Sequence, residues 1–328
     1  PEHKGSPFAS LDEHPIAAAS IGQIHQGKLV SGEEVAVKVQ YPDMESVMFA
    51  DLKTIRLLRP FYKVIFPSAN VEMVIEDTEK SLMQECDYLH EAKCQTAIRD
   101  FLQSQGEVYV PQIYDAYTTK RILTMEYIPG LKFYEFLHSA ERTEIDSACT
   151  KIFRHMLRCF LVGGIYNGDP HPGNYLMMPD GRICFLDFGF SFELPEDRRR
   201  AWCAFIGAIL GGEADQVRQA LQNLGYVTDW KNFDFDYARQ NVTAFLLGEG
   251  STKDRSYESY QNVMQRMSVS SKNRKYMDLV PTDLAVPRFF LSLYGFIAKA
   301  GAQVDFRREL TAIVAEAHKK SQELSTSA

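Results

Sequence analysis

The amino-acid sequence predicts an α+β fold in two parts: a mixed first part, residues 1–127, with an antiparallel sheet and inserted helices, and a mainly helical second part, residues 128–328. Three observations support this prediction. Short runs rich in β-branched and aromatic residues, bounded by turns, gather before residue 127. Apolar residues recur at helical spacing through most of the remainder. The length of 328 residues suits one large or two modest domains with a buried core.

Composition and charge narrow the class of protein. The formal net charge of −7 offers no basic surface for a polyanion, so we expect no nucleic-acid partner. The six cysteines show no C-x-x-C spacing, which disfavours zinc and disulfides and favours a reducing compartment. No apolar run reaches the roughly eighteen residues of a membrane span. The sequence does not begin with Met, so a targeting segment could precede it; we expect a cytoplasmic protein, with peripheral membrane contact as the alternative.

The first chemical feature is an alanine-rich stretch, Pro15–Gly27, in which small residues lead into an alternating strand. Small side chains let backbone N–H groups approach a ligand such as phosphate. An alanine-rich helix or core segment is the alternative. The next strand contains V-A-V-K-V, a buried pattern with one lysine, Lys38. Because a buried ammonium needs an anion, we expect Lys38 to meet a phosphate and a carboxylate; a lysine that protects a sheet edge is the alternative.

Two helices are expected next: Met44–Leu58, and one uninterrupted helix over Val71–Leu102, which contains no Pro or Gly. The longer helix carries three acids, Glu85, Asp87 and Glu91, any of which could pair with the buried lysine. Glu85 and Glu91 are six residues apart, about 240° around a helix, and therefore face different ways. A solvated acidic face is the alternative for each acid.

Strands are then expected over Val108–Val110, Ile113–Tyr117 and Arg121–Tyr127, before the chain changes direction at a Pro-Gly pair. A long amphipathic helix follows from Ile145 to Val162 and ends at two glycines. Later helices are predicted over Pro195–Leu210, Ala214–Leu224, Phe233–Leu247, Tyr257–Met267, Asp283–Gly301 and Phe306–Leu324. The first of these includes three consecutive arginines, residues 198–200, which we expect to be solvated; contact with anionic lipid is the alternative.

The stretch from Ile165 to Phe190 carries the strongest signal. A hairpin with a Pro-Asp-Gly turn is predicted between Asn174 and Asp187. Because a hairpin brings its ends together, these two side chains should face one another. With Asp169 they offer the oxygen ligands that a hard cation such as Mg²⁺ prefers. A rigid surface turn and a strand-end cap are the alternative reading.

The pattern D-x-x-x-x-N, followed by D-F-G 18 residues after the first aspartate, is typical of the catalytic and metal loops of kinases. In that template Asp169 positions the acceptor, while Asn174 and Asp187 hold Mg²⁺. The backbone from Glu126 to Ile128 would then take the place of the hinge that contacts adenine. Only five residues separate D-F-G from the next helix and no A-P-E follows, so the activation segment that holds a peptide has no room. We therefore expect no ordinary protein kinase.

Five motifs resemble those of a known family. They are P-I-A-A-A-S-I-G-Q-I-H, V-A-V-K-V-Q-Y-P, Q-E-C-D-Y-L-H-E-A, G-D-P-H-P-G-N and F-L-D-F-G. In this order they are similar to the UbiB-type (AarF/ABC1-like) atypical kinases linked to ubiquinone biosynthesis, over roughly residues 10 to 210. The resemblance implies a protein-kinase-like two-lobed fold with an alanine-rich loop, binding of ATP or ADP with Mg²⁺, weak ATPase activity and a role in quinone lipid metabolism at a membrane.

The resemblance also implies roles for single residues. Lys38 would contact the phosphates, with Glu91 as its partner. Glu85 and Asp87 would form an acidic motif that meets an N-terminal K-x-G-Q segment, and this sequence contains no K-x-G-Q. The residues lying over the phosphates would be Ala17, Ala18, Ala19, Ser20, Ile21, Gly22 and Gln23.

The function expected from these features is an ATP-dependent phosphotransferase or ATPase. A small-molecule kinase of the choline or aminoglycoside type is one alternative, because such enzymes also carry D-x-H-x-x-N. A nucleotide-gated binding module or chaperone for lipid-biosynthetic enzymes is another. The expected partners are a nucleotide and a quinone-precursor lipid or membrane surface.

Overall fold

The computed structural model describes residues 6–57, 71–248, 257–267, 272–278 and 280–326. The chain forms two compact units. The first contains the described residues up to Phe133, together with Gly173–Ser191, and the second contains Tyr134–Pro172 and the chain from Phe192 onward. The division therefore differs from the single boundary expected after residue 127, because the hairpin that follows the predicted catalytic loop clusters with the first unit.

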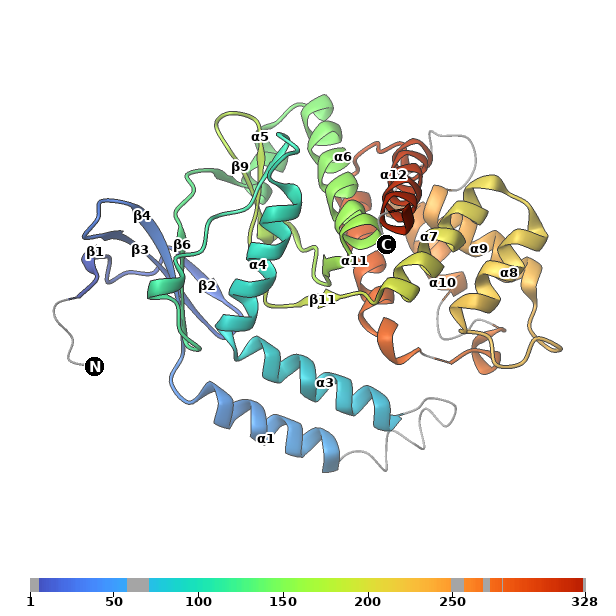
Figure 1. Ribbon diagram of the computed structural model, residues 1–328, viewed down its shortest axis with the longest axis horizontal. Coiled ribbons are helices and arrows are strands. Elements are labelled where there is room, and N and C mark those ends of the chain that lie inside the picture. Colours follow the sequence, from blue (N-terminus) through green and yellow to red (C-terminus); the bar gives the residue numbers. More distant parts are fainter. Residues whose placement is uncertain (1–5, 58–70, 249–256, 268–271, 279, 327–328) are drawn as a thin grey trace. The chain divides into compact units, whose positions relative to one another are not determined.

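An antiparallel five-stranded sheet forms one side of the first unit (Figure 1). Its path is β1-β3-β4-β6, and β2 pairs with β3. These strands are β1 (Phe8–Leu11), β2 (Ala17–Ala19), β3 (Gly22–Leu29), β4 (Glu34–Gln40) and β6 (Ile122–Glu126). The register places Lys38 between Ile24 on one neighbour and Leu123 on the other, so the lysine lies in the middle of the sheet. The edge-strand alternative for Lys38 is therefore wrong.

Helices α1 (Met44–Leu57), α3 (Val71–Glu85) and α4 (Tyr88–Leu102) follow β4, and α1 and α3 lie side by side (Figure 1). The single helix predicted over residues 71–102 is wrong, because the chain breaks at Cys86 and Asp87. Asp87 has extended backbone (φ −117°), and its side chain accepts a hydrogen bond of 3.0 Å from the amide of Leu89. A carboxylate in this position caps a new helix, so the break is set by Asp87 rather than by Pro or Gly.

A second, four-stranded sheet has the order β5-β10-β9-β7. Its strands are β5 (Val108–Tyr109), β7 (Leu131–Lys132), β9 (Tyr175–Met177) and β10 (Ile183–Phe185). The predicted hairpin is confirmed, since β9 and β10 pair antiparallel, with Gly181 at a φ of +84° in its turn. The strand predicted over residues 113–117 is wrong: Ile113 makes only an isolated bridge to Met125, and Asp115–Tyr117 form a 3-10 turn.

The second unit is mainly helical, as predicted. It contains α5 (Phe133–Ser139), which begins at the last residue of the first unit, α6 (Arg142–Arg158) and a continuing π-helical turn, Cys159–Gly163. Gly164, at a φ of +72°, ends this helix where the glycine pair predicted it. The strands β8 (Ile165–Asn167) and β11 (Ser191–Glu193) pair with each other. The later helices are α7 (Glu196–Gly211), α8 (Ala214–Leu224), α9 (Phe235–Leu247), α10 (Tyr257–Met267), α11 (Ala285–Lys299) and α12 (Phe306–Thr326).

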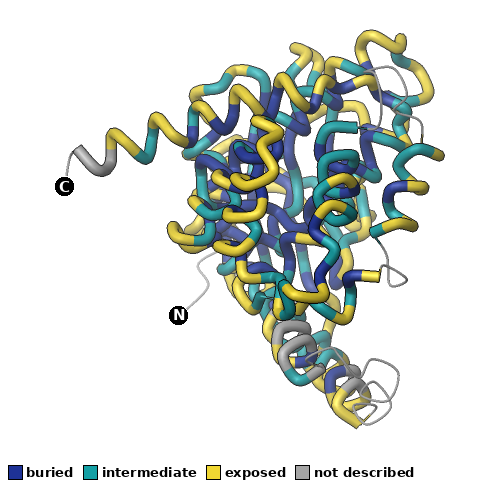
Figure 2. Tube along the Cα trace, turned by 90° about the vertical axis from the view of Figure 1, so that its right-hand side faces the viewer, coloured by how far each residue is buried: buried dark blue, intermediate teal, exposed yellow. Residues whose placement is uncertain are grey.

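Aromatic rings form the core of the second unit. Phe160 stacks on Phe289 with ring centroids 5.4 Å apart, and Phe153 meets Tyr294 edge-on at 5.4 Å. In Figure 2 the buried residues gather between the helices, while residues 318–323 of α12, near the end marked C, are half-buried or exposed. Among the described residues, no helix is both long and apolar enough to cross a membrane.

The expectation that residues 198–200 are simply solvated is wrong for two of the three arginines. Arg198 is paired with the fully buried carboxylate of Asp283. Arg199 is buried, donating to the carbonyl oxygen of Leu161 (2.9 Å) and to Glu196. Only Arg200 is exposed, and it too pairs with Glu196. These side chains therefore hold α7 to its neighbours within the second unit.

Candidate active site

Lys38 is the centre of a buried charge cluster in the first unit. Its Nζ donates to both carboxylate oxygens of Glu91, at 2.9 and 3.0 Å, and lies 3.5 Å from Oδ1 of Asp187. The side chains of Lys38 and Glu91 are only 5% and 2% exposed. The predicted pairing of Lys38 with an acid of the following helices is therefore confirmed, and the partner is Glu91.

The break in the predicted long helix explains this choice among the three acids. Because Asp87 starts α4, Glu91 falls in the first turn of that helix, where its carboxylate also accepts a hydrogen bond of 3.4 Å from the amide of Phe188. Asp87 is occupied in capping, and Glu85 is the last residue of α3. The predicted angle of about 240° between Glu85 and Glu91 around one helix is wrong, because the two acids stand on different helices.

Two features set the pKa values in the cluster: burial, and the presence of two carboxylates beside one ammonium. Burial disfavours the ammonium of Lys38, but the nearby carboxylates of Glu91 and Asp187 outweigh burial and raise the pKa of Lys38 above its ordinary value. Burial also raises the pKa of Glu91, with the charge of Lys38 acting against it. By formal charge, the cluster places two carboxylates beside one ammonium.

Asp187 stands at the end of the β9–β10 hairpin in an unusual backbone conformation. Its φ of +57° lies in the left-handed region, which is uncommon for residues other than Gly, although Asn and Asp adopt it more readily than most. The side chain accepts a hydrogen bond of 3.2 Å from the amide of Gly189 and is 39% exposed, so its oxygens are accessible. At the other end of the hairpin, the carbonyl of Asn174 accepts a hydrogen bond of 2.8 Å from the amide of Leu186. The hairpin therefore brings the backbone at Asn174 beside the residue that precedes Asp187, while the facing of the two side chains stays a prediction.

The alanine-rich segment is a tight hairpin, with β2 paired to β3 across a turn at Ser20 and Ile21. Ile21 is buried and anchors this turn in the core of the first unit. Gly22 is required by close packing, because a Cβ there would lie 2.2 Å from the carbonyl oxygen of Val39. The helical alternative for this segment is therefore wrong. The arrangement presents small residues and backbone at the end of the sheet that carries Lys38.

The predicted hinge, Glu126 to Ile128, begins at the last residue of β6. The amide of Glu126 donates to the carbonyl of Gln112, and that of Tyr127 donates to the carbonyl of Glu34. The side chain of Glu126 also accepts a hydrogen bond of 2.6 Å from Tyr109. A bound purine would therefore form its hydrogen bonds with the amide of Ile128 or with carbonyl groups of this segment.

Asp169 lies in the second unit, just after β8. Its amide donates to Oδ1 of Asn167 (2.8 Å) and its carbonyl accepts from the amide of His171 (2.7 Å), so the backbone of the loop is held locally. Its carboxylate lies 3.6 Å from Nη2 of Arg288, on α11. Arg288 could not be predicted as a neighbour of Asp169, because no local pattern links two residues 119 positions apart.

Comparison with known proteins now identifies the family. The model of the ABC1 atypical kinase-like domain matches residues 2–221. The chain belongs to this family. The resemblance described from the motifs is thereby confirmed.

Relatives in this ABC1 family include Protein ACTIVITY OF BC1 COMPLEX KINASE 3, chloroplastic, from Arabidopsis thaliana, which is 38% identical over 201 residues (59% of this chain and 28% of the relative). AarF domain-containing protein kinase 1 from Xenopus laevis is 30% identical over 227 residues (66% of this chain and 43% of the relative). The ABC1 chain thus spans less than half the length of these relatives.

A solved structure resembles the ABC1 chain over most of its length. Rv3197 from Mycobacterium tuberculosis, solved in complex with erythromycin, matches with a TM-score of 0.74 and 24% sequence identity, over 92% of this chain and 77% of that one. At this identity the match is evidence for the fold alone. The kinase-like α+β fold predicted from the sequence is therefore confirmed.

The first unit of this ABC1 chain offers two oxygen ligands that suit Mg²⁺: the carboxylate of Asp187 and the side-chain amide oxygen of Asn174. Among the residues that the structure describes, no group of three or more His, Cys, Asp and Glu side chains is arranged for a metal ion. By donor chemistry alone, one carboxylate and one amide oxygen suit a cation that takes its remaining ligands from a phosphate and water, which is the usual state of Mg²⁺ in proteins that bind nucleotides.

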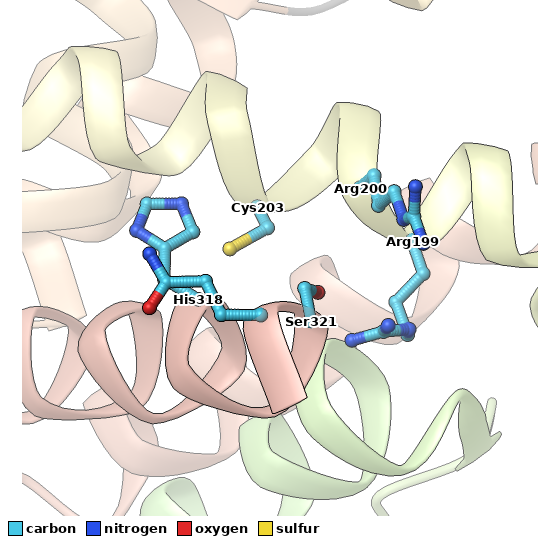
Figure 3. Close-up of a pocket in the computed structure, with 6 residues that line it drawn as sticks. Arg199, Arg200, Cys203, His318 and Ser321 are labelled. Atoms are coloured by element: carbon cyan, nitrogen blue, oxygen red, sulfur yellow. The ribbon is translucent and has the colours of Figure 1, made fainter. Parts of the chain in front are cut away.

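A separate cavity of about 340 Å³ lies between α7 and α12 in the second unit. Figure 3 shows the thiol of Cys203 facing His318 and Ser321, with two arginines, residues 199 and 200, at one end. Both arginines pair with Glu196. Burial raises the pKa of the Cys203 thiol to about 11 and keeps it unreactive. We assign no ligand to this cavity.

Proposed function

We propose that this chain is an atypical kinase or ATPase that binds Mg-ATP, or ADP, and transfers the terminal phosphoryl group to a small or lipid-related acceptor or to water. The observation that carries the proposal is the buried amine of Lys38, held between Glu91 and Asp187 in the middle of a sheet. A buried ammonium with this support is a site for phosphate oxygens.

In this proposal each group of residues has its own role in phosphoryl transfer. Backbone N–H groups of the β2–β3 hairpin approach the phosphates, and Lys38 neutralises phosphate charge while Glu91 holds its side chain in place. Asn174 and Asp187 would hold Mg²⁺, which when bound neutralises charge on the phosphates. Asp169 accepts the proton of the acceptor hydroxyl as the new oxygen–phosphorus bond forms, the bond to the terminal phosphorus breaks and ADP leaves.

The acceptor is unlike a peptide. Only residues 190–194 separate D-F-G from Pro195 and α7, so the chain has no segment that could hold a protein substrate there. The similarity of the motifs to proteins linked to quinone biosynthesis supports a quinone-precursor lipid as acceptor or regulator, and with it a place at the periphery of a membrane.

The test is Asp187→Asn. Asparagine tolerates a positive φ as well as aspartate does and has nearly the same shape, so the substitution removes charge without disturbing the backbone. We expect magnesium-dependent ATP turnover to fall by about 100-fold or more. The control is Asp180→Asn, in the turn of the same hairpin, where the side chain is exposed and pairs with Arg182; it should turn over ATP like the parent chain.

Turnover by Asp187→Asn at the parent rate would refute the assignment. The fate of the phosphate separates the remaining alternatives. Radiolabelled ATP incubated with the protein and a quinone-precursor lipid extract gives a labelled lipid or small molecule if the chain is a phosphotransferase, and free phosphate if it is an ATPase. Tight binding of ADP with neither product would indicate a nucleotide-gated module instead.

A further inference from the structure

The predicted catalytic carboxylate of Asp169 faces a basic side chain from a distant part of the second unit. Nη2 of Arg288 lies 3.6 Å from Oδ1 of Asp169. The loop from Asp169 to Asn174 contains one histidine but neither lysine nor arginine. The cation beside this carboxylate therefore comes from α11, which no motif in the sequence connects to the catalytic loop.

The aromatic core determines the position of Arg288. The two residues that follow it, Phe289 and Phe290, are buried. Phe289 packs against Tyr166 with ring centroids 5.3 Å apart, and Tyr166 lies on β8, three residues before Asp169. One aromatic contact thus fixes both the strand that leads into the catalytic loop and the turn of α11 that carries Arg288.

Stability alone gives little reason for this ion pair. Its side chains are 56% and 41% exposed, and exposed pairs contribute little to folding because water and salt screen them. Phosphoryl transfer, by contrast, depends on the orientation of the group that receives the acceptor proton and on positive charge near the reacting oxygens. At 3.6 Å, Arg288 and Asp169 form an ion pair rather than a hydrogen bond, so it is the positive charge of the guanidinium that attracts Oδ1.

We propose that Arg288 is a positioning residue for Asp169, and that it holds Oδ1 so that Oδ2 is directed at the acceptor hydroxyl or water. This inference rests on the proposed function. The proton of the acceptor passes to Oδ2 while the phosphoryl group moves from ATP to the acceptor oxygen, and Arg288 takes no part in either bond. Its removal therefore affects the rate of transfer rather than the binding of nucleotide.

The experiment compares Arg288→Gln, which removes the charge, with Arg288→Lys, which keeps it. Arg200→Gln is the matched control, because Arg200 and Glu196 form an ion pair of similar exposure (59% and 49%) on α7. We expect Arg288→Gln to lower kcat for ATP turnover roughly tenfold, a part of the roughly 10²- to 10⁴-fold that a positioned base supplies. KM for ATP, the affinity for Mg-ADP and Tm should change little, and Arg288→Lys should recover part of kcat.

Two further measurements separate positioning from a general structural effect. In an Asp169→Asn background, Arg288→Gln should cause no additional loss, because the side chain acts through the one already removed. Added methylguanidinium should restore part of the turnover of Arg288→Ala. Turnover by Arg288→Gln equal to that of Arg200→Gln, or an additional loss in the Asp169→Asn background, would overturn the inference while the proposed function stands. Absence of nucleotide binding and turnover in the parent chain would overturn both.

Discussion

The substitution Glu91→Gln tests the charge cluster around Lys38 directly. It keeps the size of the side chain and removes one of the two negative charges near the buried amine. Removing one partner of a buried ion pair typically costs roughly 3–5 kcal/mol, because the remaining charge is left in a poorly solvated place. Here Asp187 stays 3.5 Å from Nζ, and the glutamine oxygen can still accept one hydrogen bond. We therefore expect a smaller loss, about 2–3 kcal/mol in the free energy of unfolding.

Urea unfolding followed by fluorescence and circular dichroism measures this loss. The control is Lys120→Gln, which breaks the exposed pair between Lys120 and Glu45 and should change stability little. The double variant Lys38→Met, Glu91→Leu should recover most of the loss, since apolar residues often replace a buried pair without penalty. If Glu91→Gln were as stable as Lys120→Gln, or if the double variant were the least stable of the three, the account of Lys38 as a buried and compensated charge would be wrong.

Two other predictions concern packing and pH. Gly22→Ala should destabilise the first unit by about 1–3 kcal/mol, because the added Cβ would collide with the carbonyl of Val39. Gly207→Ala is the control: it lies inside α7, its Cβ would make ordinary contacts, and it should stabilise the protein slightly. Thermal unfolding of the two variants measures the difference. The hydrogen bond from Arg158 lowers the pKa of Glu316 below its ordinary value of 4.5. A carboxylate whose pKa is lowered by folding stabilises the protein above pH 4.5, and this stabilisation is lost as the pH falls through the pKa of the folded state. Glu316→Gln should therefore flatten the dependence of the free energy of unfolding on pH below 4.5. An unchanged slope would contradict this prediction.

Much of the fold was predictable because its signals are local. The β9–β10 hairpin follows from a Pro-Asp-Gly turn between two apolar runs, and the end of the helix at Gly164 follows from a glycine pair. The break at Asp87 was missed for a physical reason. A search for Pro and Gly finds residues that cannot continue a helix, but Asp87 ends one helix by capping the next, and its side chain is equally common on a solvated helical face.

Long-range pairings in the candidate site were only partly predictable. The sequence shows that Lys38 needs an anion, but three acids could supply it, and only the break before α4 places Glu91 under the lysine. Arginines 198 and 199 look solvated because three basic residues in a row usually are, yet the fold provides Asp283 and the carbonyl of Leu161 for them. Partners that are set by tertiary packing leave no local trace.

The balance of charge in the first unit links its stability to its proposed chemistry. One ammonium, from Lys38, lies beside two carboxylates, from Glu91 and Asp187. Glu91 is buried and committed to Lys38, whereas Asp187 is partly exposed and is held in a left-handed conformation that few side chains adopt. By formal charge, the second carboxylate is therefore the one that a ligand can reach. A phosphate alone would add negative charge beside it, but a phosphate that arrives with a divalent cation would offset that charge. Under the proposed function, the cluster would therefore favour a metal–nucleotide complex over the free nucleotide, which is the discrimination that a magnesium-dependent kinase requires.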